Sequence, residues 1–199
     1  MASVMAVGFS CGGTGLARTG TALAAGVLLG VLARPLARAE GIDASLMAAT
    51  SNSADVKKLG VTIGVTRAEP LWEGELWRLK LRHEFEAAAW RVPKARDLLE
   101  AGYSPVFRFE RSVGSGAATL FLEGSIGARL LSHTQVAPDR VLSTAFQFSD
   151  VAGLGVRRGQ EGQPGSSSLS MRLQHMSNAD IKRPNPGINF LQVRYTYQF

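Results

Sequence analysis

The chain has little of several residues that common folds and sites depend on. Its 199 residues include one cysteine, Cys11, so an intramolecular disulfide framework is excluded. Its three histidines show no metal-ligand spacing with carboxylates, so we expect no zinc or calcium site and no cofactor. No segment reaches the roughly 18 apolar residues of a transmembrane helix. Helical periodicity is also missing, which leaves a β-protein as the first expectation.

The most apolar segment, residues 21–39, is built like a secretory signal peptide. It reads TALAAGVLLGVLARPLARA, with Arg18 before it and the pattern Ala37-Arg38-Ala39 at its end. A basic start, an apolar centre of about a dozen residues and an A-x-A end are typical of a cleaved export signal. We therefore predict that residues 1–39 are removed and that residues 40–199 form the mature domain. The alternative is a short membrane anchor.

Removal of this segment changes what the charge implies. Residues 1–39 carry three arginines and no acid, so the formal net charge falls from +6 to +3 on their removal. Much of the basic character therefore belongs to the signal, and no basic run is interleaved with aromatic residues as in nucleic-acid binders. We expect no nucleic-acid partner. Cys11 leaves with the signal too, so the mature chain has no thiol chemistry.

Alternation of apolar and polar residues recurs from Gly41 to the end of the chain. It predicts eight strands, at residues 42–49, 56–67, 76–90, 101–111, 118–131, 143–157, 168–177 and 189–199. Most of them are near or above the roughly 9–11 residues that cross a bilayer at a tilt. The segments between them are rich in turn residues, and residues 93–100 are compatible with a helical turn.

The two faces of each strand differ sharply, and three features favour a membrane barrel. The predicted signal exports the chain. Tyr195, Tyr197 and Phe199 put aromatic rings at a strand end, where a membrane interface favours them. The final aromatic residue also resembles the C-terminal signature of bacterial outer-membrane proteins. We predict an all-β fold: an eight-stranded antiparallel transmembrane β-barrel in the bacterial outer membrane, with a polar, filled interior.

This fold fixes which side chains face inward. A soluble, calycin-like barrel would put its charges outside around an apolar core, whereas an outer-membrane barrel turns charges of both signs into the lumen. An eight-stranded barrel is narrow enough for side chains to fill it, so a wide pore is not expected. The charges predicted to face the lumen are Arg78, Lys80, Arg82, Glu84, Arg108, Glu110, Glu123, Arg129, Arg172 and Arg194.

A pair of reactive residues, His175 and Ser177, lies on the apolar face of the seventh predicted strand. Residues two apart on a strand share a face, with backbones roughly 7 Å apart. A serine hydroxyl becomes a nucleophile when a base takes its proton, and a neutral imidazole is the usual base. On the lipid face, such a pair would meet a substrate in the bilayer. The alternative is a polar cap in the headgroup zone.

The sequence around this pair, HMSNADIKRPNPGIN, resembles the lipid A 3-O-deacylases of the PagL family. The pattern is His-x-Ser-Asn, a loop with Pro-Asn-x-Gly, and the final strand. Weaker similarity covers AGYSPVFRFE, LFLEGSIGARLLS and STAFQFSD. The family consists of eight-stranded outer-membrane barrels that hydrolyse the 3-position ester of lipid A. The resemblance implies that His175 is the general base, that Ser177 is the nucleophile, and that Asn178 and Asn185 hold the oxyanion.

The resemblance has one departure, at Asn189. The family pattern has a glutamate fourteen residues after the histidine, as the third member of the triad. An asparagine can accept a hydrogen bond from the imidazole and fix its tautomer, but it cannot stabilise the imidazolium by charge. Asp150, on the apolar face of its strand, is a substitute acid or a supporting residue. Its alternative is an ordinary strand-end residue at the interface.

The sequence thus predicts an outer-membrane serine esterase acting on lipopolysaccharide. Lys182 and Arg183, in the loop beside the site, would pair with lipid A phosphates or remain solvated. The other partners expected are outer-membrane lipids, and a homodimer is compatible with the sequence. The rival interpretation is a non-enzymatic small barrel with a structural or adhesion role.

Overall fold

The structure is a computed structural model, and it describes residues 39–51, 54–114, 116 and 118–199. The predicted signal peptide, residues 1–39, lies outside the described residues except for its last residue. Its cleavage therefore stays a prediction. Among the described residues, no helix is long and apolar enough to cross a membrane.

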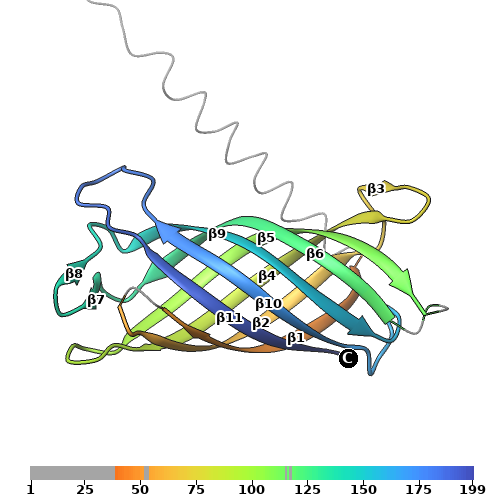
Figure 1. The fold of residues 1–199 in the computed structure, drawn as a ribbon, viewed down its shortest axis with the longest axis horizontal. Coiled ribbons are helices and arrows are strands. Elements are labelled where there is room, and N and C mark those ends of the chain that lie inside the picture. The colour runs from red at the N-terminus through yellow and green to blue at the C-terminus, as the bar shows by residue number, and fades with distance from the viewer. Residues whose placement is uncertain (1–38, 52–53, 115, 117) are drawn as a thin grey trace, which may run out of the picture. The chain divides into compact units, whose positions relative to one another are not determined.

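Eight long antiparallel strands form a closed barrel (Figure 1). Neighbours in the sheet follow the order β2-β1-β11-β10-β9-β6-β5-β4, and β2 pairs with β4 to close it. This confirms the predicted fold. The strands are β1 (Ala39–Thr50), β2 (Lys57–Arg67), β4 (Arg78–Arg91), β5 (Leu98–Val113), β6 (Ala118–Leu131), β9 (Phe146–Arg158), β10 (Ser167–Ser177) and β11 (Ile188–Gln198).

Three short strands in the connections were not predicted: β3 (Trp72–Glu73), β7 (Gln135–Ala137) and β8 (Arg140–Val141). The helical turn expected at residues 93–100 is wrong, because β5 already begins at Leu98. Leu98 pairs with Trp90, and Glu100 pairs with Ala88 and Leu131. Both side chains are buried inside the barrel, so their packing favours strand over helix.

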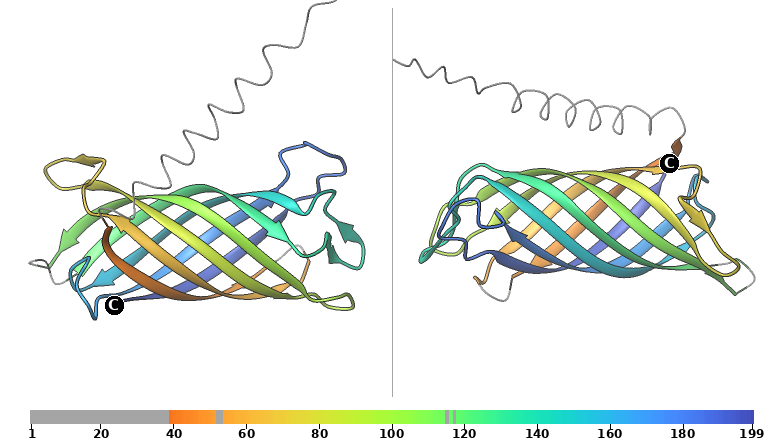
Figure 2. Two further views of the ribbon diagram at one scale, coloured as in Figure 1. Left: turned by 180° about the vertical axis from the view of Figure 1, so that it is seen from behind. Right: turned by 90° about the horizontal axis from the view of Figure 1, so that it is seen from above.

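The two ends of the barrel differ in their connections. The C-terminus and β3 lie at one end, whereas β7, β8 and the connection at residues 178–187 lie at the other (Figures 1 and 2). We name the second end the loop end. It carries connections at residues 51–56, 92–97, 132–145 and 178–187. Outer-membrane barrels carry their longer loops on the extracellular side, so the loop end is the outer end.

The barrel wall has the inverted polarity of a membrane protein. Large apolar side chains point outward, for example Leu46, 66% exposed, and Ile126, 69% exposed. Nine of the ten charges predicted to face the lumen are buried; only the side chain of Arg78 is partly exposed, at 36%. This confirms the polar interior, and a soluble barrel with its charges outside is wrong.

The buried charges compensate one another. Glu84 accepts hydrogen bonds from Arg172 at 2.8 and 2.9 Å, from Arg194 at 2.7 Å and from Arg82 at 2.9 Å. Similar contacts join most of the lumen, and a buried charge with several partners avoids the large penalty of an unpaired one. The network comprises Lys58, Lys80, Arg82, Arg108, Arg129, Arg157, Arg172 and Arg194 with Asp43, Glu84, Glu86, Glu100, Glu110, Glu123 and Glu161.

An apolar plug, not predicted from the sequence, fills the lumen towards the loop end. Trp90 and Phe190 meet edge to face, with ring centroids 4.8 Å apart. Lys58 Nζ lies 5.7 and 5.5 Å from these two ring centroids, so the plug joins the charge network through a cation–π contact. The plug comprises Met47, Ala49, Val56, Ala88, Trp90, Val92, Leu98, Leu131, Val136, Leu142, Met176, Ile188 and Phe190.

Candidate active site

Strand β10 positions His175 and Ser177 through the residues between and before them. Met176 is fully buried in the apolar plug, and Gln174 is buried in the lumen. The Gln174 amide nitrogen donates to Ser149 Oγ at 2.7 Å, and its oxygen accepts from Lys58 Nζ at 3.2 Å. Because side chains alternate along a strand, these inward anchors turn His175 and Ser177 outward.

The imidazole of His175 is held by its partner on the next strand. His175 and Asn189 are opposite one another in the β10–β11 register, and His175 Nδ1 donates to Asn189 Oδ1 at 2.6 Å. Since an amide oxygen can only accept, this bond puts the ring proton on Nδ1. In the neutral ring the lone pair is then on the other nitrogen, Nε2, which can act as a base.

A carboxylate flanks the ring on its other side. Asp150 is opposite His175 in the β9–β10 register, and its side chain is exposed on the outer wall. Directly opposite residues in an antiparallel pair have Cβ atoms about 4.5–5.5 Å apart. His175 therefore lies between Asn189 and Asp150.

The two predicted oxyanion residues are joined to each other in the connection at residues 178–187. The backbone N–H of Asn178 donates to Asn185 Oδ1 at 3.1 Å, and the Asn178 side-chain nitrogen donates to Lys182 O at 2.7 Å. Asn178 is 1% exposed, and both of its donor groups are engaged. In contrast, the bond to Asn185 Oδ1 fixes that half-buried amide and leaves its Nδ2 as a donor.

Three residues to which sequence reasoning gave no role support this connection. Gly187 has a φ of 57°, and a Cβ added there would lie 3.0 Å from His175 Cε1. Glycine thus permits both the left-handed backbone and the close approach to the ring. Arg140 Nη1 donates to Gly187 O at 3.2 Å, and the Ser143 hydroxyl donates to Pro184 O. The Pro-Asn-x-Gly pattern pointed to Gly187, but no local signal marked Arg140 or Ser143.

An apolar groove of about 820 Å³ runs along the outer wall beside His175. We name it the first groove. It extends from β9 across β10 and β11 to β1, and its lining includes Thr50, Asp150, Ala152, Leu173, His175, Asn189 and Leu191. Its volume and its mainly apolar lining suit a hydrocarbon chain, with the polar groups at one end.

Other candidate groups lie away from this site. His83 points outward from β4 but is only 3% exposed, and its Nδ1 lies 2.8 Å from Tyr103 Oη. His133 Nε2 donates to Asp97 O at 3.1 Å. Lys182 and Arg183 are exposed, and Arg183 pairs with Asp180 at 3.2 Å. No group of three or more His, Cys, Asp or Glu side chains within the described residues could hold a metal ion.

Comparison with known proteins identifies the family. Residues 57–198 match the family model described as lipid A 3-O-deacylase (PagL). The chain is 36% identical over 129 residues to the lipid A deacylase PagL of Bordetella bronchiseptica, an alignment covering 63% of this chain and 66% of that protein. It is 28% identical over 170 residues to the lipid A deacylase PagL of Pseudomonas aeruginosa, covering 76% and 90%. The crystal structure of the outer-membrane enzyme PagL superposes with a TM-score of 0.69 at 22% identity, over 79% of this chain and 99% of that one. The chain belongs to the lipid A 3-O-deacylase (PagL) family of outer-membrane enzymes.

Proposed function

We propose that this outer-membrane lipid A deacylase is a serine esterase that cleaves the 3-position acyl ester. The observation that carries the proposal is the 2.6 Å bond from His175 Nδ1 to Asn189 Oδ1, with Ser177 on the same outward face. The pair lies near the loop end beside an apolar groove, where the ester of a lipid in the outer leaflet would be presented.

The reaction proceeds in two displacements. Ser177 Oγ attacks the ester carbonyl carbon while His175 Nε2 takes its proton. The tetrahedral intermediate collapses, the imidazolium returns the proton to the sugar 3-oxygen, and the acyl group stays on Ser177. Water then attacks the acyl-serine with His175 as base, which releases the fatty acid and restores the hydroxyl.

Three asparagines have distinct supporting roles in this reaction. Asn185 Nδ2 donates to the oxyanion of each tetrahedral intermediate, which is the usual device for stabilising that charge. Asn178 positions Asn185 through its backbone N–H and holds the connection through Lys182 O. Asn189 fixes the tautomer of His175.

Asp150 supplies the negative charge that Asn189 lacks. Its carboxylate stands beside the ring as a direct register partner. Across one strand spacing of about 4.8 Å, this carboxylate would attract the positive charge that His175 carries during each step. The acid of the triad is thereby carried by β9 instead of β11.

Alanine variants test the mechanism. Ser177→Ala and His175→Ala should each abolish deacylation, because the nucleophile or its base is lost. Ser167→Ala is the matched control, since Ser167 lies on the same face of β10 at the other end of the barrel. Deacylation is read as the loss of one acyl chain in the mass spectrum of lipid A, and folding as heat-modifiable mobility in gels. Full activity of folded Ser177→Ala protein would exclude the serine mechanism, and unchanged lipid A with the wild type would favour the structural barrel.

Two further proposals concern processing and assembly. We propose that export removes residues 1–39, so N-terminal sequencing of the membrane-inserted protein should begin at Glu40. A start upstream of residue 40 would favour the membrane anchor instead.

We also propose a homodimer in the membrane, which chemical cross-linking of outer membranes would detect as a species of twice the mass.

A further inference from the structure

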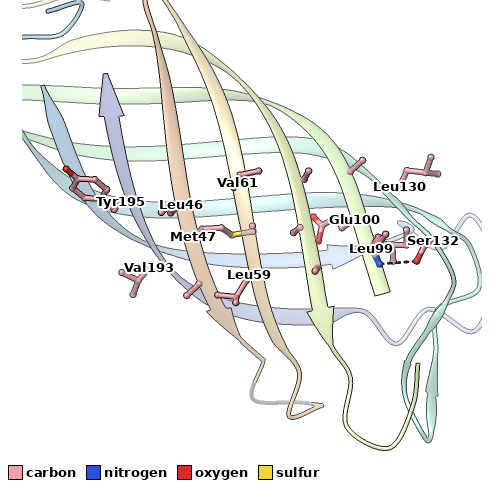
Figure 3. Close-up of a pocket in the computed structure, with 17 residues that line it drawn as sticks. Leu46, Met47, Leu59, Val61, Leu99, Glu100, Leu130, Ser132, Val193 and Tyr195 are labelled. Atoms are coloured by element: carbon pink, nitrogen blue, oxygen red, sulfur yellow. Dashed lines mark hydrogen bonds between the residues drawn. The ribbon is translucent and has the colours of Figure 1, made fainter. Parts of the chain in front are cut away.

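A second apolar groove, of about 990 Å³, lies on the outer wall next to the first. Figure 3 shows its lining, from Tyr195 and Val193 on one side to Leu130 and Ser132 on the other. Small outward residues make the hollow: Ala48 on β1, Ala87 and Ala89 on β4, and Ala101 on β5. Larger neighbours form its sides. This volume is at the upper end of the roughly 300–1,000 Å³ of small-molecule sites.

The strand register places the two grooves side by side. Thr50, which lines the first groove, is opposite Leu191 on one side and Lys57 on the other. Two residues earlier on β1, Ala48 lines the second groove and is opposite Val193 and Leu59. The two grooves therefore meet on β1 and β11, where their nearest lining residues are two positions apart.

Positive charge borders the second groove at the loop end. Lys57 and Arg91 are direct register partners on β2 and β4, and both are exposed on the outer wall. Like charges in such a position destabilise a sheet unless an anion compensates them. Arg91 contacts the exposed Asp97 at 3.1 Å, while the connection at residues 92–97 adds the exposed Lys94 and Arg96. The exposed acids at this border are Asp97 and Asp55, two residues before Lys57, so the four cations remain in excess.

We propose that this second groove and its two cations dock the part of lipid A that is not hydrolysed. Acyl chains lie against the alanines, and a phosphate lies between Lys57 and Arg91. A groove without charges would suit any lipid, but the cationic border selects a phosphorylated one. This inference rests on the proposed function, because it places the remainder of the same substrate.

The spacing fits one molecule bound across both grooves. From β10, which carries His175, to β2, which carries Lys57, there are three strand spacings. At about 4.8 Å each, this is ~14 Å along the wall. A headgroup of linked sugars spans such a distance, whereas a single esterified sugar does not reach from the nucleophile to the cations.

Removing the charges tests the phosphate contact. The double variant Lys57→Gln/Arg91→Gln should lose about tenfold or more in kcat/KM on phosphorylated lipid A in mixed micelles, since charge-assisted contacts are the strong ones. The ratio of kcat/KM on phosphorylated to dephosphorylated lipid A should fall with it. Arg111→Gln is the charge control, because Arg111 is exposed at the far end of β5. An unchanged ratio in the double variant would overturn the phosphate contact.

Filling the hollow tests the acyl contact. Ala87→Leu/Ala89→Leu keeps the wall apolar but occupies the second groove, so kcat/KM should fall on both substrates. Ala44→Leu, outward on β1 and outside the groove, is the matched control. If the double variant were as active as Ala44→Leu, the proposed contact between acyl chains and the second groove would be overturned.

Binding separates the two proposals. Lipid A binding to Ser177→Ala protein should weaken when Lys57→Gln and Arg91→Gln are added. Unchanged binding there would overturn the docking site even if Ser177 proves to be the nucleophile. Conversely, weakened binding would support the docking site even if the serine mechanism failed.

Discussion

Moving the negative charge beside His175 from Asp150 to position 189 gives the sharpest test of the site. Asn189→Asp keeps the shape of the side chain and places a carboxylate where Oδ1 now lies, 2.6 Å from His175 Nδ1. Asp150→Asn removes the carboxylate on the opposite side of the ring. The double variant moves the single negative charge from β9 to β11, so both the amount of charge and the shape of each side chain are retained.

Coulomb's law gives an upper limit for the size of each effect. Two unit charges about 4 Å apart would interact by about 4 kcal/mol at an effective dielectric constant of 20 and by about 1 kcal/mol in water, whereas His175 and Asp150 are register partners across one strand spacing of about 4.8 Å. His175 and Asp150 are exposed, so the lower part of this range applies. About 1.4 kcal/mol, or tenfold in rate, should be lost in Asp150→Asn. The double variant should return to within a few-fold of the wild type.

Initial rates of lipid A deacylation in mixed micelles, followed by mass spectrometry, provide the assay. Asn189→Ala serves as the severe reference, since loss of the tautomer lock should cost much of the roughly 10²–10⁴-fold that a positioned base contributes. Heat-modifiable mobility verifies folding in every variant. If Asp150→Asn keeps the wild-type rate while Asn189→Asp raises it, Asp150 supplies no charge to His175. If folded Asn189→Ala is fully active, the bond to Nδ1 does not control the reaction.

Three other predictions follow from the same structure. Asn185→Ala should lower kcat by about 10²–10³-fold through loss of an oxyanion donor, and unchanged initial rates would remove that role. Arg172→Met should destabilise the barrel by about 3–5 kcal/mol, because it leaves its two carboxylate partners less compensated. Urea unfolding in detergent measures this, and an unchanged midpoint would contradict it. Burial alone would raise the pKa of Glu161, but the charges of Arg157 and Lys80 outweigh it and lower that pKa. Its stabilisation is therefore present above the ordinary value of 4.5 and lost as pH falls below it, so Glu161→Gln should lower stability at pH 7 more than at pH 3.

The barrel could be predicted from the sequence because its signal is local. Each strand alternates with a period of two, and one face carries charges of both signs. Alternation does not say which face is inside, and the predicted signal peptide and the C-terminal aromatic residues decided that point. The ends of the strands were predicted less accurately. Leu98 belongs to β5 because it pairs with Trp90, and the turn-rich sequence around it does not indicate this pairing.

The apolar plug and the loop contacts lay beyond sequence reasoning because they join distant segments. Trp90 has the same parity as Glu84 and Glu86, so alternation places it in the lumen. Only the closed barrel brings it against Phe190. In the same way, the motif implied the same oxyanion role for Asn178 and Asn185. Only the geometry shows that Asn178 already donates hydrogen bonds within the loop.

The lumen network also explains why His175 and Ser177 face lipid. A slip of β10 by one residue against both neighbours would turn every one of its side chains to the other face. Arg172 would then leave Glu84 and Glu123 for the hydrocarbon, where an arginine costs about 2–4 kcal/mol near the bilayer centre. Gln174 would lose Lys58 and Ser149 as partners, and Met176 would leave the plug. The charges inside the barrel therefore fix the register that presents the reactive pair outside it.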